Sequence, residues 1–102
     1  MKKVNQQLSP RTYLRKAQSR FEASGQSEVA EQQMRYLRNQ FGFYGLKAPV
    51  WTPLAKELFA TYGLLNGDKL KRFVRFCFKD DHRELHYLAI EMVQKQLRKQ
   101  DA

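Results

Sequence analysis

The side chains of this sequence that could do chemistry on a partner are mainly arginines and lysines. In the stretch 69–79, Arg72, Arg75 and Lys79 lie about half a turn away from an apolar stripe, at roughly 100° per residue. Two further groups of cations precede them in the chain: Arg11, Arg15, Lys16 and Arg20, then Arg35 and Arg38. Cationic groups on helix faces can neutralise phosphates without reading bases. A charged helix face is more often simply solvated, so the pattern alone leaves both interpretations open.

The charge balance of the whole chain favours an anionic partner. Its 102 residues include 19 Lys and Arg against 10 Asp and Glu, a formal net charge of +9. In a chain of this length such an excess attracts polyanions, of which nucleic acid is the commonest. An acidic membrane surface or an acidic protein fits the number as well. With 42% hydrophobic and 28% charged residues, we expect one small globular domain over residues 1–102.

A tyrosine flanked by arginines is the second candidate for contact with a partner. A buried helical stripe is indicated by apolar residues at spacings of four, three and four: Ala30, Met34, Leu37 and Phe41. Tyr36 and Asn39 then point away from that stripe, with Arg35 and Arg38 beside it. This arrangement suits a surface that meets a partner, although an off-stripe tyrosine could also pack against a neighbouring helix.

Few other residues suit catalysis or metal binding. His82 and His86 are four positions apart, but no third ligand is evident because Cys77 belongs to an apolar stripe. We therefore expect ordinary surface histidines and neither a metal nor a cofactor. Asp81 and Glu84 fit a helix capping box, which accounts for them without acid–base chemistry. The sequence contains no Gly-rich phosphate loop, Ser-His-Asp set or zinc-ligand spacing.

Targeting and processing signals are sparse. Cys77 is the single cysteine, so an internal disulfide cannot form. The basic start of the chain has no apolar stretch behind it, and we do not read it as a signal peptide. No apolar run approaches the length of a membrane span. A cytoplasmic protein is the default expectation. Residues 1–8 are polar, and we expect them to be frayed.

The pattern of apolar residues predicts an all-α chain of about five helices, over residues 10–23, 28–41, 53–62, 69–79 and 82–98. Ser9-Pro10 and Thr52-Pro53 are typical helix starts, and Gly25 and Gly63 are typical stops. No strand-like alternation of useful length occurs. We expect helices two with three, and four with five, to form antiparallel pairs about forty residues apart, which is the period of HEAT-type repeats.

The last predicted helix, 82–98, has two apolar stripes. One consists of Leu85, Leu88, Ala89 and Met92, and the other of Tyr87, Ile90, Val93 and Leu97. A helix that is apolar on both sides is normally covered on both sides. In a solenoid, each repeat is covered by its neighbour. We therefore expect an uncovered surface on this helix, as in a truncated solenoid, suited to self-association or to a C-terminal partner.

Two segments of the chain resemble a known family. The run Met34-x-Tyr36-Leu37-Arg38-Asn39-x-Phe41-x-Phe43-x-Gly45-x-x-x-Pro49 is similar to a segment near the start of the DNA alkylation repair family, the AlkD-like alkylpurine DNA glycosylases built from HEAT-like repeats. The run Arg83-Glu84-Leu85-His86-Tyr87-Leu88-Ala89-Ile90-Glu91 resembles a later helix of that family. One departure is Trp51, which lies close behind Pro49, where the family tends to have charged residues.

The resemblance implies an N-terminal, DNA-contacting part of such a glycosylase. Its tyrosine matching Tyr36 lines a concave DNA-facing cleft, and we expect duplex DNA phosphate to dock on a basic concave face. The expected DNA-binding residues are Arg35, Tyr36, Arg38, Asn39, Lys47, Arg72, Arg75 and Lys79. The catalytic aspartate and tryptophans of the family have no counterpart here, so we expect no base excision by this chain alone. The alternative is a helical-repeat scaffold that binds an acidic protein.

Overall fold

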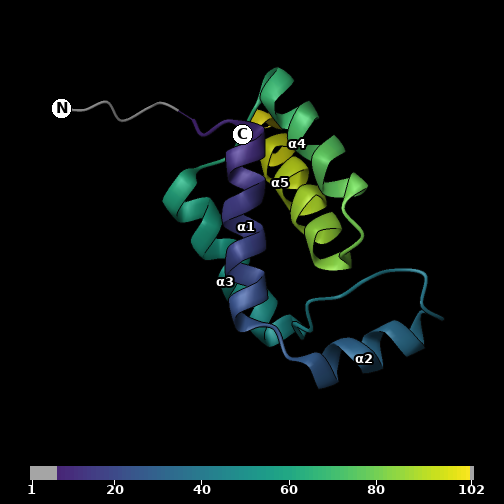
Figure 1. The fold of residues 1–102 in the computed structure, drawn as a ribbon. Coiled ribbons are helices and arrows are strands. Elements are labelled where there is room, and N and C mark those ends of the chain that lie inside the picture. The colour runs from purple at the N-terminus through teal and green to yellow at the C-terminus, as the bar shows by residue number, and fades with distance from the viewer. Residues whose placement is uncertain (1–6, 102) are drawn as a thin grey trace.

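The computed structural model describes residues 7–101 and contains five α-helices (Figure 1). They are α1 Pro10–Ser24, α2 Ser27–Tyr36, α3 Ala48–Tyr62, α4 Gly67–Lys79 and α5 Arg83–Asp101. Within residues 7–101 there is no β-strand, only one isolated bridge between Gly42 and His82. The all-α prediction is confirmed, and the fold is consistent with a helical repeat.

Four of the helices share one core. α1 packs against both α3 and α4, and α5 lies along α4 (Figure 1). Tyr13 and Phe21 from α1, Phe73 from α4 and Leu88 from α5 are completely buried. The Tyr13 hydroxyl donates hydrogen bonds to the carbonyl oxygens of Gly63 at 2.6 Å and Leu58 at 3.3 Å, which joins α1 to the end of α3. The expected pairing of the fourth and fifth helices is therefore found.

The expected pairing of the second and third helices is wrong. α2 lies apart from the other four helices (Figure 1), and Ala30 is its one buried residue. The predicted stripe is only partly covered, since Met34 and Leu37 are half-buried. The covering comes from the loop that follows α2, because the Gln33 side chain donates to the Leu46 carbonyl oxygen at 3.3 Å.

α2 also ends five residues earlier than the predicted helix 28–41. The amide N–H of Arg38 donates to the Arg35 carbonyl oxygen at 3.0 Å, and that of Asn39 to Met34 at 2.7 Å. These two hydrogen bonds form a Schellman motif. Arg38 and Asn39 have φ angles of 56° and 59°, in the left-handed region that usually holds glycine at this position. With arginine in place of glycine, the sequence lacked the usual stop signal.

α3 begins at Ala48, five residues before the predicted helix 53–62. Pro49 lies in the first turn, where its missing N–H costs no helical hydrogen bond. Pro53 lies one turn further inside the helix, so Thr52-Pro53 does not mark the helix start; the N-cap is Lys47, which makes no side-chain capping hydrogen bond. Trp51 is consequently a first-turn residue, and its ring N–H donates to the Glu84 carbonyl oxygen at 3.2 Å.

The beginning of the described chain is attached to the core. The Gln7 side chain donates to the Leu64 carbonyl oxygen at 2.8 Å, and Leu8 packs against the core cluster. The prediction of fraying is wrong for these two residues; for residues 1–6 it lies outside the described residues. Ser9 caps α1 as predicted, since its hydroxyl accepts the Thr12 N–H at 3.2 Å.

A buried glutamate anchors the loop between α2 and α3. Glu84 is 1% exposed, and its carboxylate accepts the backbone N–H groups of Tyr44 at 3.0 Å, Gly45 at 3.0 Å and Leu46 at 3.1 Å. The predicted capping box with Asp81 is therefore wrong, because the carboxylate serves the loop instead of its own helix. At Gly45, φ is 94° and a Cβ would lie 2.0 Å from the Gln26 carbonyl oxygen, so only glycine fits.

Candidate nucleic-acid interface

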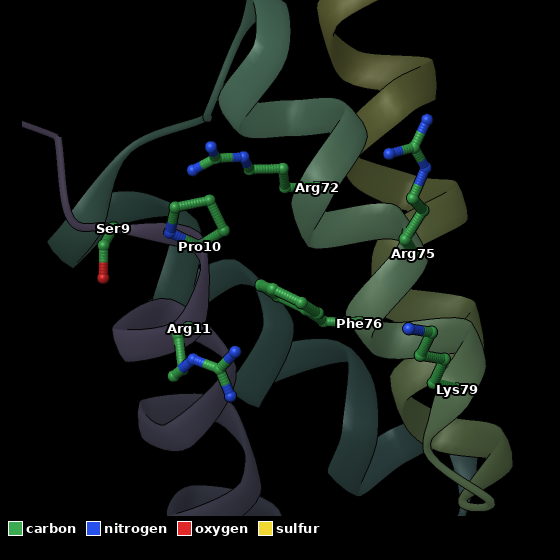
Figure 2. A pocket seen from close by; sticks show the side chains of 7 residues that line it. All are labelled: Ser9, Pro10, Arg11, Arg72, Arg75, Phe76 and Lys79. Carbon is green, nitrogen blue, oxygen red and sulfur yellow. The ribbon is translucent and has the colours of Figure 1, made fainter.

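A basic cavity lies between the start of α1 and the outer face of α4. Its volume is about 550 Å³. Figure 2 shows the side chains that line it, which are Ser9, Pro10, Arg11, Arg72, Arg75, Phe76 and Lys79. We call this cavity the α1–α4 groove. Three residues of the predicted DNA-binding set, Arg72, Arg75 and Lys79, are therefore brought together by the fold.

The helices position the cations by turning apolar neighbours inward. On α4, Phe73 and Cys77 are completely buried. Arg72, Arg75 and Lys79, at spacings of three and four, are exposed on the opposite side. Burial raises the pKa of the Cys77 thiol, with the nearby Asp80 carboxylate adding to the effect. The cysteine therefore stays protonated in the core.

Arg11 completes the groove from α1. Its guanidinium carbon lies 4.9 Å from the centroid of the Phe76 ring, a cation–π distance. The Ser9 hydroxyl is already engaged with Thr12, and in Figure 2 its oxygen points away from Arg72 and Arg75. The polar groups of the groove that can bind a ligand are therefore its four cations, Arg11, Arg72, Arg75 and Lys79.

These four cations face no compensating acid. Among residues 7–101, no aspartate or glutamate lines the groove. In the described part of the chain, none of the four cations forms an ion pair, whereas Arg20 on α1 is paired with Glu57 of α3. Like charges held together on a surface create a positive potential that an anion relieves. The groove is thus suited to a phosphate-bearing ligand.

The other five predicted residues lie elsewhere. Arg35, Tyr36, Arg38 and Asn39 form the exposed end of α2, and Lys47 is the exposed N-cap of α3. None of them lines the α1–α4 groove. Tyr36 is 86% exposed, so the alternative that it packs against a neighbouring helix is wrong. It borders a separate hollow of about 320 Å³ together with Phe43 and Tyr87.

Four groove residues were not in the predicted set, and two of them, Arg11 and Phe76, matter for binding. Arg11 was noted only as one cation of the first helix, because sequence spacing cannot show that the start of this helix lies beside α4. Phe76 has no role in the predicted interface. Its position one helical turn from Phe73, but off the apolar stripe, was the available signal, since an aromatic ring there has to lie at the edge of the core.

The turn between α4 and α5 is held by an aspartate and two histidines. Asp80 accepts hydrogen bonds from the backbone N–H of His82 at 2.9 Å and from Gln18 at 2.9 Å, and its carboxylate lies 2.7 Å from His82 Nδ1. Partial burial opposes the charged carboxylate, but these hydrogen bonds outweigh it and lower the pKa of Asp80. The Tyr44 ring stacks on His82 with centroids 3.9 Å apart.

His86 is not the surface histidine that the sequence indicated. It is 4% exposed, and its Nε2 lies 2.6 Å from the Asp80 carbonyl oxygen. Its ring stacks on Phe78 at 4.9 Å and meets Phe41 edge-on at 5.8 Å. His86 therefore ties the loop after α2 to the α4–α5 turn.

The second apolar stripe of α5 is exposed, as predicted. Leu85, Leu88, Ala89 and Met92 are completely buried, whereas Tyr87, Ile90 and Leu97 are 42%, 42% and 55% exposed. Phe78 of α4, 47% exposed, extends this surface. Between the two helices is an apolar hollow of about 170 Å³, lined mainly by Val74, Phe78, Ile90 and Val93.

The fold and this surface define an all-α protein with a cationic groove and an uncovered apolar helix face. The sequence of residues 17–102 matches the model of the family described as DNA alkylation repair enzyme. The chain therefore belongs to the DNA alkylation repair enzyme family, as the two sequence segments indicated, and a role related to DNA repair is supported. A search of curated proteins finds no match. Within residues 7–101, no helix is both long and apolar enough to cross a lipid bilayer.

Proposed function

We propose that this chain docks duplex DNA by its phosphate backbone in the α1–α4 groove. The observation that carries the proposal is the convergence of Arg11, Arg72, Arg75 and Lys79 on one cavity without a carboxylate in its lining. Arginine can bind phosphate oxygens bidentately, and lysine contributes a point charge. Cations at helical spacing follow a backbone and carry no base-reading geometry of their own, so we expect binding with little sequence preference.

The exposed end of α2 provides the second part of this proposed interface. Tyr36, Arg35 and Arg38 reach solvent there, together with Asn39, and Lys47 follows at the start of α3. These residues are outside the α1–α4 groove, so we assign them contacts to a separate stretch of the duplex. Because the groove supplies cations and no general acid or base, docking rather than base excision is the function that we propose for this chain.

The salt dependence of DNA binding tests the proposal. If the four groove cations neutralise about four phosphates, log K should fall against log salt with a slope of roughly −3 to −4, and more steeply where Arg35, Arg38 and Lys47 neutralise further phosphates. Affinity for a 20-base-pair duplex, followed by fluorescence anisotropy, should then decrease by roughly a hundredfold or more between 50 and 200 mM NaCl. Two duplexes of unrelated sequence should give the same slope. Absence of binding at 50 mM NaCl, or a flat salt response, would contradict phosphate docking.

The exposed α5 surface supports a second candidate, a scaffold that binds an acidic protein or a second copy of the chain. Large apolar side chains at 42–55% exposure on one helix face are typical of an interaction surface. Charge disfavours the second copy, because two chains of net charge +9 repel each other.

We therefore expect a monomer in sedimentation velocity at 150 mM NaCl, with Leu97→Glu sedimenting identically. Leu97 lies on the exposed stripe, so the substitution should not disturb the core. A dimer that Leu97→Glu dissociates would instead establish self-association through α5.

A further inference from the structure

The groove proposed to bind phosphate also contains an aromatic ring. Phe76 extends from α4 toward the start of α1 and is half-buried. Arg11 lies over one face of the ring, with its guanidinium carbon 4.9 Å from the centroid. In Figure 2 the ring lies between Arg11 on one side and Arg72 and Pro10 on the other. The second face of Phe76 is thus directed into the groove.

A cationic groove with an aromatic platform is the combination that binds single-stranded nucleic acid. The cations follow the backbone while bases stack on the ring, and each stacked base contributes about 1–3 kcal/mol. In intact duplex DNA the bases are stacked on one another, so a ring at the bottom of a groove cannot reach their faces. A cavity of about 550 Å³ falls within the range of sites that hold small organic ligands, which is ample for one nucleotide.

We infer that the α1–α4 groove holds an unpaired nucleotide of a DNA strand, with its base on the open face of Phe76. Arg72, Arg75 and Lys79 neutralise the phosphates on either side of that nucleotide. Arg72, which lies across the open face from Phe76, can cover the base from the other side as a planar guanidinium. The inference rests on the proposed docking of duplex DNA and deepens it: an unpaired nucleotide of a single-stranded end, gap or bulge adds a stacked base to the phosphate contacts that a duplex makes in this groove.

The other ring faces of the interface do not offer the same site. Tyr36 is 86% exposed, but its hollow is lined by Gln32, Gln33, Leu37, Phe43 and Tyr87, with no cation. The Tyr44 ring is already stacked on His82, and Phe78 on His86. Of these rings, Phe76 is therefore the one that stacks with a cation of the groove, Arg11.

The test compares three labelled DNAs by fluorescence anisotropy at 50 mM NaCl: a blunt duplex, the same duplex with a three-nucleotide overhang, and that overhang with abasic sugars. We expect the base-bearing overhang to bind about tenfold more tightly than the abasic one, as about 1.4 kcal/mol of stacking would give. The abasic overhang keeps every phosphate, so this difference isolates the bases. Phe76→Leu should abolish it, and Phe76→Tyr should preserve it.

Blunt-duplex affinity separates this inference from the proposed docking. Phe76→Leu keeps all four cations but removes the ring under Arg11, so it should weaken blunt-duplex binding by clearly less than the tenfold that it removes from the base-bearing overhang. Equal binding of base-bearing and abasic overhangs by the wild type would overturn the nucleotide site while leaving duplex docking intact. Loss of binding to all three DNAs would overturn both. If Phe76→Leu unfolds, the wild-type comparison of base-bearing with abasic overhangs still decides.

A free nucleotide is the alternative source of the same chemistry. Deoxyadenosine 5′-monophosphate carries one phosphate against four cations, so millimolar concentrations should be needed to displace the overhang. Displacement at micromolar concentration would identify a mononucleotide site and overturn the assignment to a DNA strand.

Discussion

Replacing Glu84 by alanine is expected to destabilise the protein by about 3 kcal/mol or more. The substitution removes the acceptor of three backbone N–H groups, at Tyr44, Gly45 and Leu46. Each buried donor left without a partner costs about 1–3 kcal/mol. For a chain with a typical stability of about 5–15 kcal/mol, such a loss is a large fraction of the total. Urea denaturation followed by circular dichroism measures it directly.

Two further variants sharpen this test. Glu84→Gln keeps the shape but turns an NH₂ group toward N–H donors, so we expect a loss of about 2 kcal/mol. Glu91→Gln is the matched control on the same helix, because its partners Lys95 and Arg98 lie at the surface at 3.8 and 3.7 Å. It should change stability by less than about 0.5 kcal/mol. Similar losses for Glu84→Gln and Glu91→Gln would show that the loop does not depend on this carboxylate.

Removing two groove cations is expected to weaken duplex binding by roughly 10- to 100-fold. In the double variant Arg72→Gln/Arg75→Gln, two charge-assisted contacts are lost. Both side chains are exposed, so the fold should be preserved, which the thermal unfolding curve verifies. The double variant Lys56→Gln/Lys99→Gln is the control, with the same change in net charge at exposed residues of α3 and α5. It should lose less than about threefold in affinity, measured at 50 mM NaCl.

Helix type and core membership were predictable because they depend on local periodicity. The stripes of α4 and α5 fix which side of each helix is buried, and Phe73, Leu85, Leu88 and Met92 are all completely buried. The two apolar stripes of α5, one covered and one exposed, were predictable from the same periodicity.

Helix ends and long-range contacts were not predictable in the same way. The end of α2 depends on Arg38 adopting a left-handed φ of 56°, a conformation for which arginine has no preference. The role of Glu84 depends on a loop some forty residues away. The sequence pattern predicted a capping box within one helix, but the tertiary contact of Glu84 with the loop between α2 and α3 forms instead.

The candidate site was likewise predictable only where its residues share one helix. Arg72, Arg75 and Lys79 were predictable as one set because they share a face of one helix. Arg11 and Phe76 join this set because α1 packs on α4. Tyr36 lies elsewhere because α2 is apart from the other four helices. The spacing of residues within one helix shows neither which helices pack together nor how far apart their side chains lie.

The difference in salt slope between wild type and Arg72→Gln/Arg75→Gln tests the account most directly, because it counts phosphates rather than measuring affinity. The account predicts that the double variant's slope of log K against log salt is shallower by about 2, since each neutralised phosphate contributes about 0.9. The Lys56→Gln/Lys99→Gln control should keep the wild-type slope. Equal slopes for wild type and the groove variant would contradict phosphate docking between α1 and α4.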